Sequence, residues 1–284
     1  MSMKVVLDGQ SLHEVKQFTF NDGSVQIEIL GDLPAMAQHV IVEAIVRTPA
    51  DQMALVLLKS SIDSMFPLAE VHLVMPFCPY GRQDQSFIRG QANGMKAWAG
   101  LVNHLNFATV AVMDPHSIAV NHINNLFEVN ITDILSASSE FMELFLGPDM
   151  TLVSPDAGAN KKAHKIAQKY GFTKLVRADK ARDLATGEII ETELYGDVEG
   201  DTCLIVDDIC DGGMTFIKLA EKLKEAGAEK VILFVTHGLF TKGLSVFEGL
   251  IDEIYTTDTW IRDEGIEDGY TGKFVVCSGQ QAGS

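Results

Sequence analysis

Residues 202–215 read TCLIVDDICDGGMT, and this stretch decides the fold class. The apolar run Thr202–Val206 has the length and the β-branched content of a strand buried in a parallel sheet. Apolar residues then recur at helical spacing, at Phe216, Leu219, Ala220 and Leu223, and the pattern ends at Gly227. The stretch therefore predicts a strand, a tight turn and an amphipathic helix, the repeating unit of α/β proteins.

The turn of this unit follows the carboxyl end of a strand, which is where open α/β sheets bind ligands. Gly212 and Gly213 allow backbone N–H groups to converge on an anion, and the helix N-terminus adds partial positive charge. Carboxylates would repel a phosphate, so Asp207 and Asp208 are better suited to sugar hydroxyls or to a divalent cation carried with the substrate. The stretch predicts a site for a phosphorylated sugar, with the phosphate at Asp211–Thr215.

Composition narrows the class of protein. The 284 residues carry a net charge of −17, which argues against general nucleic-acid binding. The sequence shows no apolar stretch long enough for a membrane span and no signal peptide, and its four cysteines form no CxxC pair. We therefore expect a cytoplasmic protein with reduced thiols. Cations are concentrated between Lys161 and Arg182, which indicates a place where polyanions bind.

Short apolar runs alternate with helix-like segments, which predicts parallel sheets with helices on both faces. The predicted strands are Lys4–Leu7, Val25–Leu30, His39–Val46, Glu70–Met75, Thr109–Met113, Thr151–Val153, Lys174–Val176, Glu188–Glu193, Thr202–Val206, Lys230–Val235, Glu253–Thr256 and Lys273–Cys277. A break near Leu146-Gly147-Pro148 divides the chain into halves that repeat the same theme. We expect two lobes, residues 1–146 and 147–284, each with a mostly parallel sheet flanked by helices.

Five of the apolar runs end in charged or ligand-type residues. They lead into PFCPYGRQD (76–84), DPHS (114–117), SPDAG (154–158), DDICDGG (207–213) and THG (236–238). Because the carboxyl ends of parallel strands share one edge of a sheet, these tips are expected to converge on one cleft or on two facing clefts.

The motifs PYGRQD, MDPHS, SPDAG, DKARD (179–183), VDDICDGG and THGLF resemble the successive motifs of ribose-phosphate pyrophosphokinases (PRPP synthetases), in the same order. The resemblance covers about residues 20–279, whereas type I phosphoribosyltransferases share only the acidic motif. It implies two type I phosphoribosyltransferase-like lobes, the first on the ATP side and the second on the ribose 5-phosphate side. The implied reaction transfers the β,γ-diphosphoryl group of ATP to the 1-hydroxyl of ribose 5-phosphate, giving PRPP and AMP.

The resemblance also implies a role for particular residues. Lys180 and Arg182 match a catalytic lysine and arginine on a mobile loop, and His116 and Asp156 match positions associated with Mg²⁺. The implied ATP site comprises Phe20, Asp22, Arg82, Gln83, Asp84 and His116. The implied ribose 5-phosphate site comprises Asp207, Asp208, Asp211, Gly212, Gly213, Met214 and Thr215.

Phe20 and Asp22 match a segment that reaches the adenine from a neighbouring protomer, which implies a homo-oligomer with shared active sites. From the residues alone, Phe20–Gly23 reads equally well as a hairpin turn.

The chain departs from the family pattern at several positions. Ser24 stands in place of a glutamate, Gln85 in place of an arginine, Gly212 in place of a threonine and Met214 in place of a glycine. The segment between Lys4–Leu7 and Phe20 is short for the family's first helix, and no counterpart of the family's last helix follows Ser278. We expect a compact enzyme that binds the sugar phosphate somewhat more weakly and is less regulated.

Two other functions are open at this point. A catalytically silent relative could act as the regulatory subunit of a true synthetase, although it would have no reason to retain Lys180, Arg182, His116 and the motif acids together. A phosphoribosyltransferase that consumes PRPP would leave the motifs around Arg82 and His116 unexplained.

Overall fold

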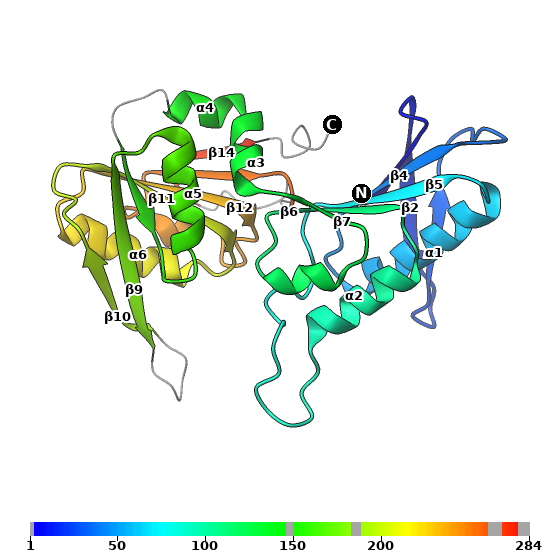
Figure 1. The fold of residues 1–284 in the computed structure, drawn as a ribbon, viewed down its shortest axis with the longest axis horizontal. Coiled ribbons are helices and arrows are strands. Elements are labelled where there is room, and N and C mark those ends of the chain that lie inside the picture. The colour runs from blue at the N-terminus through cyan, green and yellow to red at the C-terminus, as the bar shows by residue number, and fades with distance from the viewer. Residues whose placement is uncertain (1–2, 146–149, 183–188, 261–268, 278–284) are drawn as a thin grey trace. The chain divides into compact units, whose positions relative to one another are not determined.

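The computed structural model describes residues 3–145, 150–182, 189–260 and 269–277. The chain divides into two compact units, Met1–Val129 and Asn130–Ser284 (Figure 1). Each unit is built on a seven-stranded sheet. None of the described helices has both the length and the hydropathy that a membrane crossing requires.

The sheet of the first unit has the order β3-β2-β1-β4-β5-β6-β7. Its strands are β1 (Met3–Leu7), β2 (Ser11–Thr19), β3 (Val25–Ile29), β4 (His39–Ala44), β5 (Glu70–Met75), β6 (Thr109–Met113) and β7 (Leu126–Val129). Strands β4 to β7 are parallel, while β1 runs antiparallel to both β2 and β4. The sequence pattern predicted five of these strands and missed β2 and β7.

Both long helices of the first unit, α1 (Pro49–Met65) and α2 (Gly94–His104), pack on the same face of the sheet. Leu58 of α1 and Trp98 of α2 share one core with Val42 and Leu73 of the sheet. Thr48 begins α1 with a capping box, followed by a proline at the first turn, as the sequence indicated. The pattern indicated helices on both faces, but in the described part of this unit a short turn joins β1 directly to β2 and supplies no helix for the second face.

The sheet of the second unit has the order β10-β9-β8-β11-β12-β13-β14 and is parallel except for β10, which runs antiparallel to β9. Its strands are β8 (Met150–Ser154), β9 (Lys174–Arg182), β10 (Ile189–Tyr195), β11 (Thr202–Cys210), β12 (Lys230–Gly238), β13 (Glu253–Thr257) and β14 (Lys273–Cys277). The sequence pattern predicted all seven, which confirms a second α/β lobe with a mostly parallel sheet.

Helices cover both faces of this second sheet. One core joins α6 (Met214–Glu225) to one face, through Leu219 and Ile205 among others. A separate core joins α3 (Ile131–Ala137), α4 (Ser139–Phe145) and α5 (Asn160–Tyr170) to the other face. Successive residues of β11 alternate between the two cores, which is why its sequence is apolar without a break.

Helices α3 and α4 belong to the second unit because their apolar side chains complete its core. The ring of Phe141 in α4 lies 4.4 Å from that of Phe234 in β12 and 5.8 Å from that of Tyr255 in β13. The division between units therefore falls after Val129, whereas the sequence pattern placed it at residues 146–148, which lie outside the described residues.

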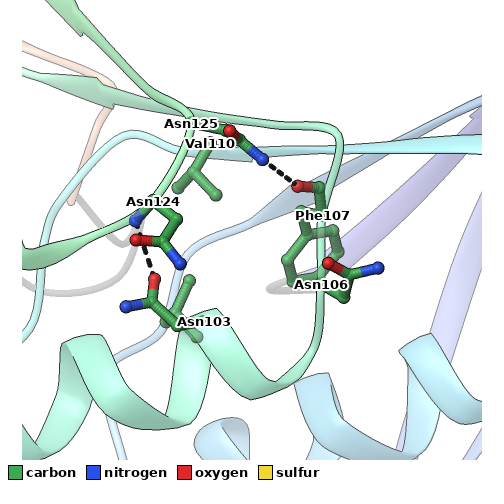
Figure 2. A pocket seen from close by; sticks show the side chains of 7 residues that line it. Asn103, Asn106, Phe107, Val110, Asn124 and Asn125 are labelled. Carbon is green, nitrogen blue, oxygen red and sulfur yellow. Dashed lines mark hydrogen bonds between the residues drawn. The ribbon is translucent and has the colours of Figure 1, made fainter.

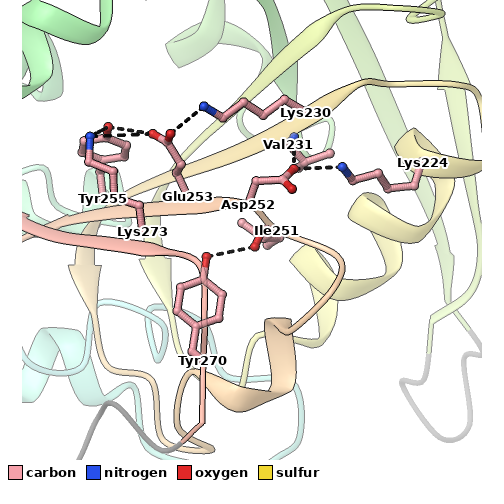
Figure 3. A network of polar contacts seen from close by, with 9 residues as sticks. All are labelled: Lys224, Lys230, Val231, Ile251, Asp252, Glu253, Tyr255, Tyr270 and Lys273. Atoms are coloured by element: carbon pink, nitrogen blue, oxygen red, sulfur yellow. Dashed lines mark hydrogen bonds and ion pairs between the residues drawn. The ribbon is translucent and has the colours of Figure 1, made fainter.

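The strands β12 and β13 begin in a network of charged contacts (Figure 3). Asp252 accepts from Lys224 Nζ at 2.8 Å and from the backbone N–H of Val231 at 2.7 Å. Glu253 pairs with Lys230 at 2.5 Å. These contacts tie the amino edge of the second sheet together and leave its carboxyl edge for ligand-type residues.

Candidate functional site

The turn that follows β11 requires glycine at one position above all. Gly213 is the N-cap of α6 and has a φ of 78°, in the left-handed region that L-residues avoid. A Cβ added there would lie 2.4 Å from the buried ring of Phe247. Glycine has no side chain with which to cap α6, so an anion can take the place of a cap at the N–H groups of the first turn.

The two adjacent acids lie on the strand and not in the turn. Strand β11 continues to Cys210, four residues beyond the predicted end, and Asp207 pairs with Val235 of β12. Strand β8 pairs with β11 only as far as Ile205, so the acidic end of β11 extends past its neighbour on that side. Asp208 is buried, and its Oδ2 lies 3.5 Å from Nζ of Lys162 in α5.

The electrostatics of the pair favour a cation or a hydroxyl as ligand. Burial, and after it repulsion from Asp208, raise the pKa of Asp207 to about 8, although Lys162 and the backbone N–H of Asp208 act in the opposite direction. Asp156 also contributes to the rise in the pKa of Asp207. An approaching cation would therefore relieve an existing charge repulsion.

Two further strand tips meet the acidic motif in this unit. The loop from β8 to α5 holds Asp156, whose Oδ1 accepts from the backbone N–H of Ala159 at 3.0 Å. The loop after β12 is tied to the motif by Thr241, whose hydroxyl donates to Asp211 at 2.8 Å. Because β8, β11 and β12 are adjacent parallel strands, the ends that carry SPDAG, DDICDGG and THG share one edge of the second sheet.

From the sequence, Lys162 received only a place among the cations between Lys161 and Arg182, and Thr241 and Lys242 received no role. Lys162 faces Asp208. The side chain of Lys242 lies next to Gly212, since a Cβ added to that glycine would be 3.4 Å from Cε of the lysine. Their positions could have indicated a role, because Lys162 follows SPDAG closely and Thr241 and Lys242 follow THG. Lys180 and Arg182 lie on β9 and pair in register with Thr192 and Ile189 of β10, but their side chains and residues 183–188 are outside the described part.

In the first unit the tips of β5 and β6 lie side by side. The hydroxyl of Ser117 donates to Asp84 Oδ2 at 2.5 Å, which joins the PYGRQD and MDPHS motifs. A Cβ on Gly81 would lie 3.5 Å from Cβ of His116. Arg82, Gln83 and His116 are exposed at this edge. The backbone is strained next to these residues, since the non-glycine residues Tyr80 and Asp114 have φ values of 62° and 36°.

Phe20 and Asp22 form the tip of the β2–β3 hairpin, which confirms the hairpin reading of this segment. Phe20 N–H donates to Ser24 O at 2.8 Å. Asp22 accepts from the hydroxyl and the N–H of Ser24, which lowers the pKa of the Asp22 carboxyl. Phe20 is 53% exposed, with its ring against Phe18.

The hairpin does not meet Arg82 and His116 within this unit. Because β1 is antiparallel to both β2 and β4, the tip points toward the edge where β4 to β6 end. Strands β1 and β4 separate β2 from β5, which corresponds to about 14 Å at the usual spacing of strands. The exposed phenyl ring therefore lies at the same edge as Arg82 and His116, but two strands separate it from the strand that precedes Arg82.

A polar pocket of 240 Å³ lies at the other edge of this sheet, where β6 and β7 begin (Figure 2). Four asparagines line it, and the side-chain amides of two of them form hydrogen bonds with the backbone. Asn103 Oδ1 accepts from the N–H of Asn124 at 2.7 Å, and Asn125 Nδ2 donates to Phe107 O at 3.1 Å. This pocket is therefore part of the scaffold and not of the strand tips.

The chain is similar in sequence to proteins of one family. A family model described as the phosphoribosyl synthetase-associated domain matches residues 158–267. The chain is 30% identical over 243 residues to a ribose-phosphate pyrophosphokinase of Cereibacter sphaeroides, covering 81% of this chain and 68% of that protein. It is 29% identical over 257 residues to that of Vibrio cholerae (88% and 79%) and 28% identical over 254 residues to that of Mycoplasmopsis pulmonis (87% and 77%).

The fold is also that of a solved structure. The phosphoribosylpyrophosphate synthetase from Mycobacterium smegmatis matches with a TM-score of 0.77 at 21% identity, covering 94% of this chain and 87% of that one. Together with the order of the strand-tip motifs, these matches show that the chain belongs to the ribose-phosphate pyrophosphokinase family.

Proposed function

We propose that this chain is a ribose-phosphate diphosphokinase, which transfers the β,γ-diphosphoryl group of ATP to the 1-hydroxyl of ribose 5-phosphate and releases AMP. The observation that carries the proposal is the carboxyl edge of the second sheet. There, two adjacent carboxylates with a raised pKa at Asp207 lie directly before a glycine turn and an uncapped helix N-terminus. Few ligands other than a phosphorylated sugar need hydroxyl acceptors and an anion cradle within one turn.

The ribose 5-phosphate would bind along this turn. Asp207 and Asp208 would accept hydrogen bonds from the ribose hydroxyls, while the N–H groups of Asp211 to Thr215 would hold the 5-phosphate. Met214 is 48% exposed and so does not fill the turn, although Gly212 supplies no hydroxyl donor. The expected consequence is a site that works mainly through backbone N–H groups.

The nucleotide would bind at the carboxyl edge of the first sheet. Arg82 is suited to bidentate contact with phosphate oxygens, and Gln83, Asp84 and His116 lie around the same tip. The exposed Phe20 and the neighbouring Asp22 would reach the adenine of a second copy, because two strands separate them from Arg82 in their own sheet. The proposed enzyme is therefore a homo-oligomer with shared active sites.

His116 in the first unit and Asp156 in the second are each a candidate ligand for Mg²⁺. The repulsion that raises the pKa of Asp207 fits a divalent cation nearby, and carboxylate oxygen is the donor that Mg²⁺ prefers. Bound Mg²⁺ would neutralise phosphate charge. Asp207 and Asp208 would meanwhile orient the ribose so that its 1-hydroxyl faces the β-phosphorus in line with the leaving oxygen.

Lys180 and Arg182 would stabilise the negative charge on the phosphoryl oxygens in the transition state. Their backbones lie at the end of β9, and residues 183–188 connect them to β10. Two cations that engage the triphosphate only when the reactants are in place would raise turnover more than binding.

A second candidate is a silent subunit of a synthetase. The matching family model is described as synthetase-associated, and Gly212 and Met214 depart from the family's cradle. The retained acids at Asp207, Asp208 and Asp211 favour the active enzyme.

One assay tests these possibilities. Purified protein with Mg·ATP and ribose 5-phosphate should release AMP and PRPP in equal amounts, and Asp208→Asn should abolish both. A matched control is Lys165→Met, an exposed residue on the same helix as Lys162, which should leave turnover unchanged. Release of ADP would overturn the proposal. Absence of turnover combined with stimulation of an active relative would indicate the silent subunit, and PRPP-dependent ribosylation of a base would indicate a phosphoribosyltransferase.

A further inference from the structure

Three potential metal ligands lie together at the amino ends of β4 and β5, at the opposite edge of the first sheet from the nucleotide residues. They are His39, Glu70 and His72, and one ligand atom from each lies within 4.8 Å of the other two. His39 Nδ1 is 3.6 Å from a carboxylate oxygen of Glu70. The rings of His39 and His72 are stacked, with centroids 6.3 Å apart and planes inclined by 28°.

The register of the sheet explains why these side chains converge. His39 of β4 is the direct partner of Glu70 of β5, so the two side chains leave the sheet on the same face. His72 is two residues after Glu70 and therefore lies on that face as well. The two long helices of this unit, α1 and α2, pack on the other face, and in the cluster His39 and Glu70 are exposed while His72 is half-buried.

The backbone beneath the cluster is held firmly. Asp8 Oδ1 accepts from the N–H of Gln38 at 3.0 Å and from the N–H of His39 at 2.8 Å. The N–H of Glu70 in turn donates to Gln38 O at 2.8 Å. The ligands thus stand on hydrogen-bonded strand ends, which place a site more accurately than loops do.

We propose that His39, Glu70 and His72 form a binding site for a divalent transition metal of the zinc type. Two imidazole nitrogens and one carboxylate oxygen are a donor set that suits Zn²⁺ better than Mg²⁺, which prefers a shell made mainly of oxygen ligands. Ligand atoms around tetrahedral zinc are about 3.3 Å apart, so the exposed side chains close on the ion by small rotations. The fourth position is left to water.

An apolar groove borders the proposed metal site at His39 and Glu70. The groove has a volume of 680 Å³ and is lined mainly by apolar residues, among them Met36, Phe66 and Leu68. Low polarity next to a metal strengthens its bonds to charged and dipolar ligands. The ion would tie β4 to β5 at the amino edge of the sheet, and this role is independent of the proposed reaction.

The test measures zinc binding without nucleotide or sugar phosphate. Full-length protein carrying His116→Ala, which removes the candidate Mg²⁺ ligand of this unit, competes with a chromophoric chelator for Zn²⁺ in the presence of excess Mg²⁺. We expect one equivalent of zinc to bind and the unfolding temperature to rise. His39→Ala and His72→Ala should each weaken binding at least tenfold, since loss of even an outer-shell partner costs about 10- to 100-fold. Glu70→Gln should weaken it as well.

The matched control is His104→Ala, which removes an exposed histidine of α2 and should leave zinc affinity unchanged. Co²⁺ bound to the protein should show the visible absorption of a tetrahedral site, and His72→Ala should abolish it. Circular dichroism separates loss of ligand from loss of fold. Equal zinc affinity in all variants, or no uptake by the parent protein at micromolar zinc, would overturn the proposal, whatever the outcome of the AMP assay.

Discussion

Replacement of Gly213 by alanine tests whether the turn before α6 has the conformation described. An alanine at φ 78° costs about 1–2 kcal/mol, because its Cβ crowds the following carbonyl oxygen. The same Cβ would lie 2.4 Å from Cζ of Phe247, which is buried. Displacing a packed ring costs about 1–3 kcal/mol more. The two terms together predict that Gly213→Ala lowers the free energy of unfolding by about 2–5 kcal/mol.

Urea unfolding measures this loss, and two glycines provide matched controls. Gly212→Ala places its Cβ 3.4 Å from the flexible side chain of Lys242, so stability should change by less than about 1 kcal/mol while affinity for ribose 5-phosphate falls. Gly100→Ala, in α2 with no atom within 4 Å, should be neutral or stabilising. At a slope of about 3 kcal/mol/M, Gly213→Ala should shift the midpoint by roughly 1 M. A midpoint for Gly213→Ala equal to that of Gly212→Ala would refute the reasoning.

Four further predictions concern the charged residues and the oligomer. The folded-state pKa of Asp207 is raised to about 8, so the folded protein binds an extra proton between pH 4 and pH 8 and loses stability as the pH rises through that window. Asp207→Asn should therefore increase the free energy of unfolding by about 1–2 kcal/mol at pH 8 and change it little at pH 4. Urea midpoints that shift equally at both pH values would contradict this. Lys162→Met leaves the buried Asp208 without its cation and should cost about 2–3 kcal/mol, compared by thermal unfolding with Lys165→Met on the exposed side of the same helix, which should cost little. Lys180→Ala should lose most of kcat in steady-state kinetics with little change in KM for either substrate, and a near-normal kcat would remove it from the mechanism. Phe20→Ala and Lys180→Ala should each be impaired alone but regain activity when mixed under subunit exchange, and failure of a mixed oligomer to recover would argue against shared sites.

Much of the fold could be predicted because hydrophobic periodicity is a local property. All seven strands of the second sheet were predicted, and the pattern is clearest in β8, β11 and β12, since residues buried on both faces of a parallel strand leave an unbroken apolar run. Strand β2 was missed because its sequence SLHEVKQFT is mostly polar, and only His13 and Val15 are buried. The end of β11 was placed too early, because carboxylates at the end of a strand read as a turn.

In the candidate site, too, some features could be predicted from the sequence and others depend on the folded chain. Residue types and their order along the chain were sufficient to place the motifs at strand ends and to identify the glycine turn, since these depend on neighbouring residues. The pairing of Lys162 with Asp208, of Thr241 with Asp211, and of His39 with Glu70 depends on the order and register of strands that are distant in sequence. Only the folded chain brings such residues within reach, because contacts between remote segments are set by the packing of the whole sheet and not by any one segment of it.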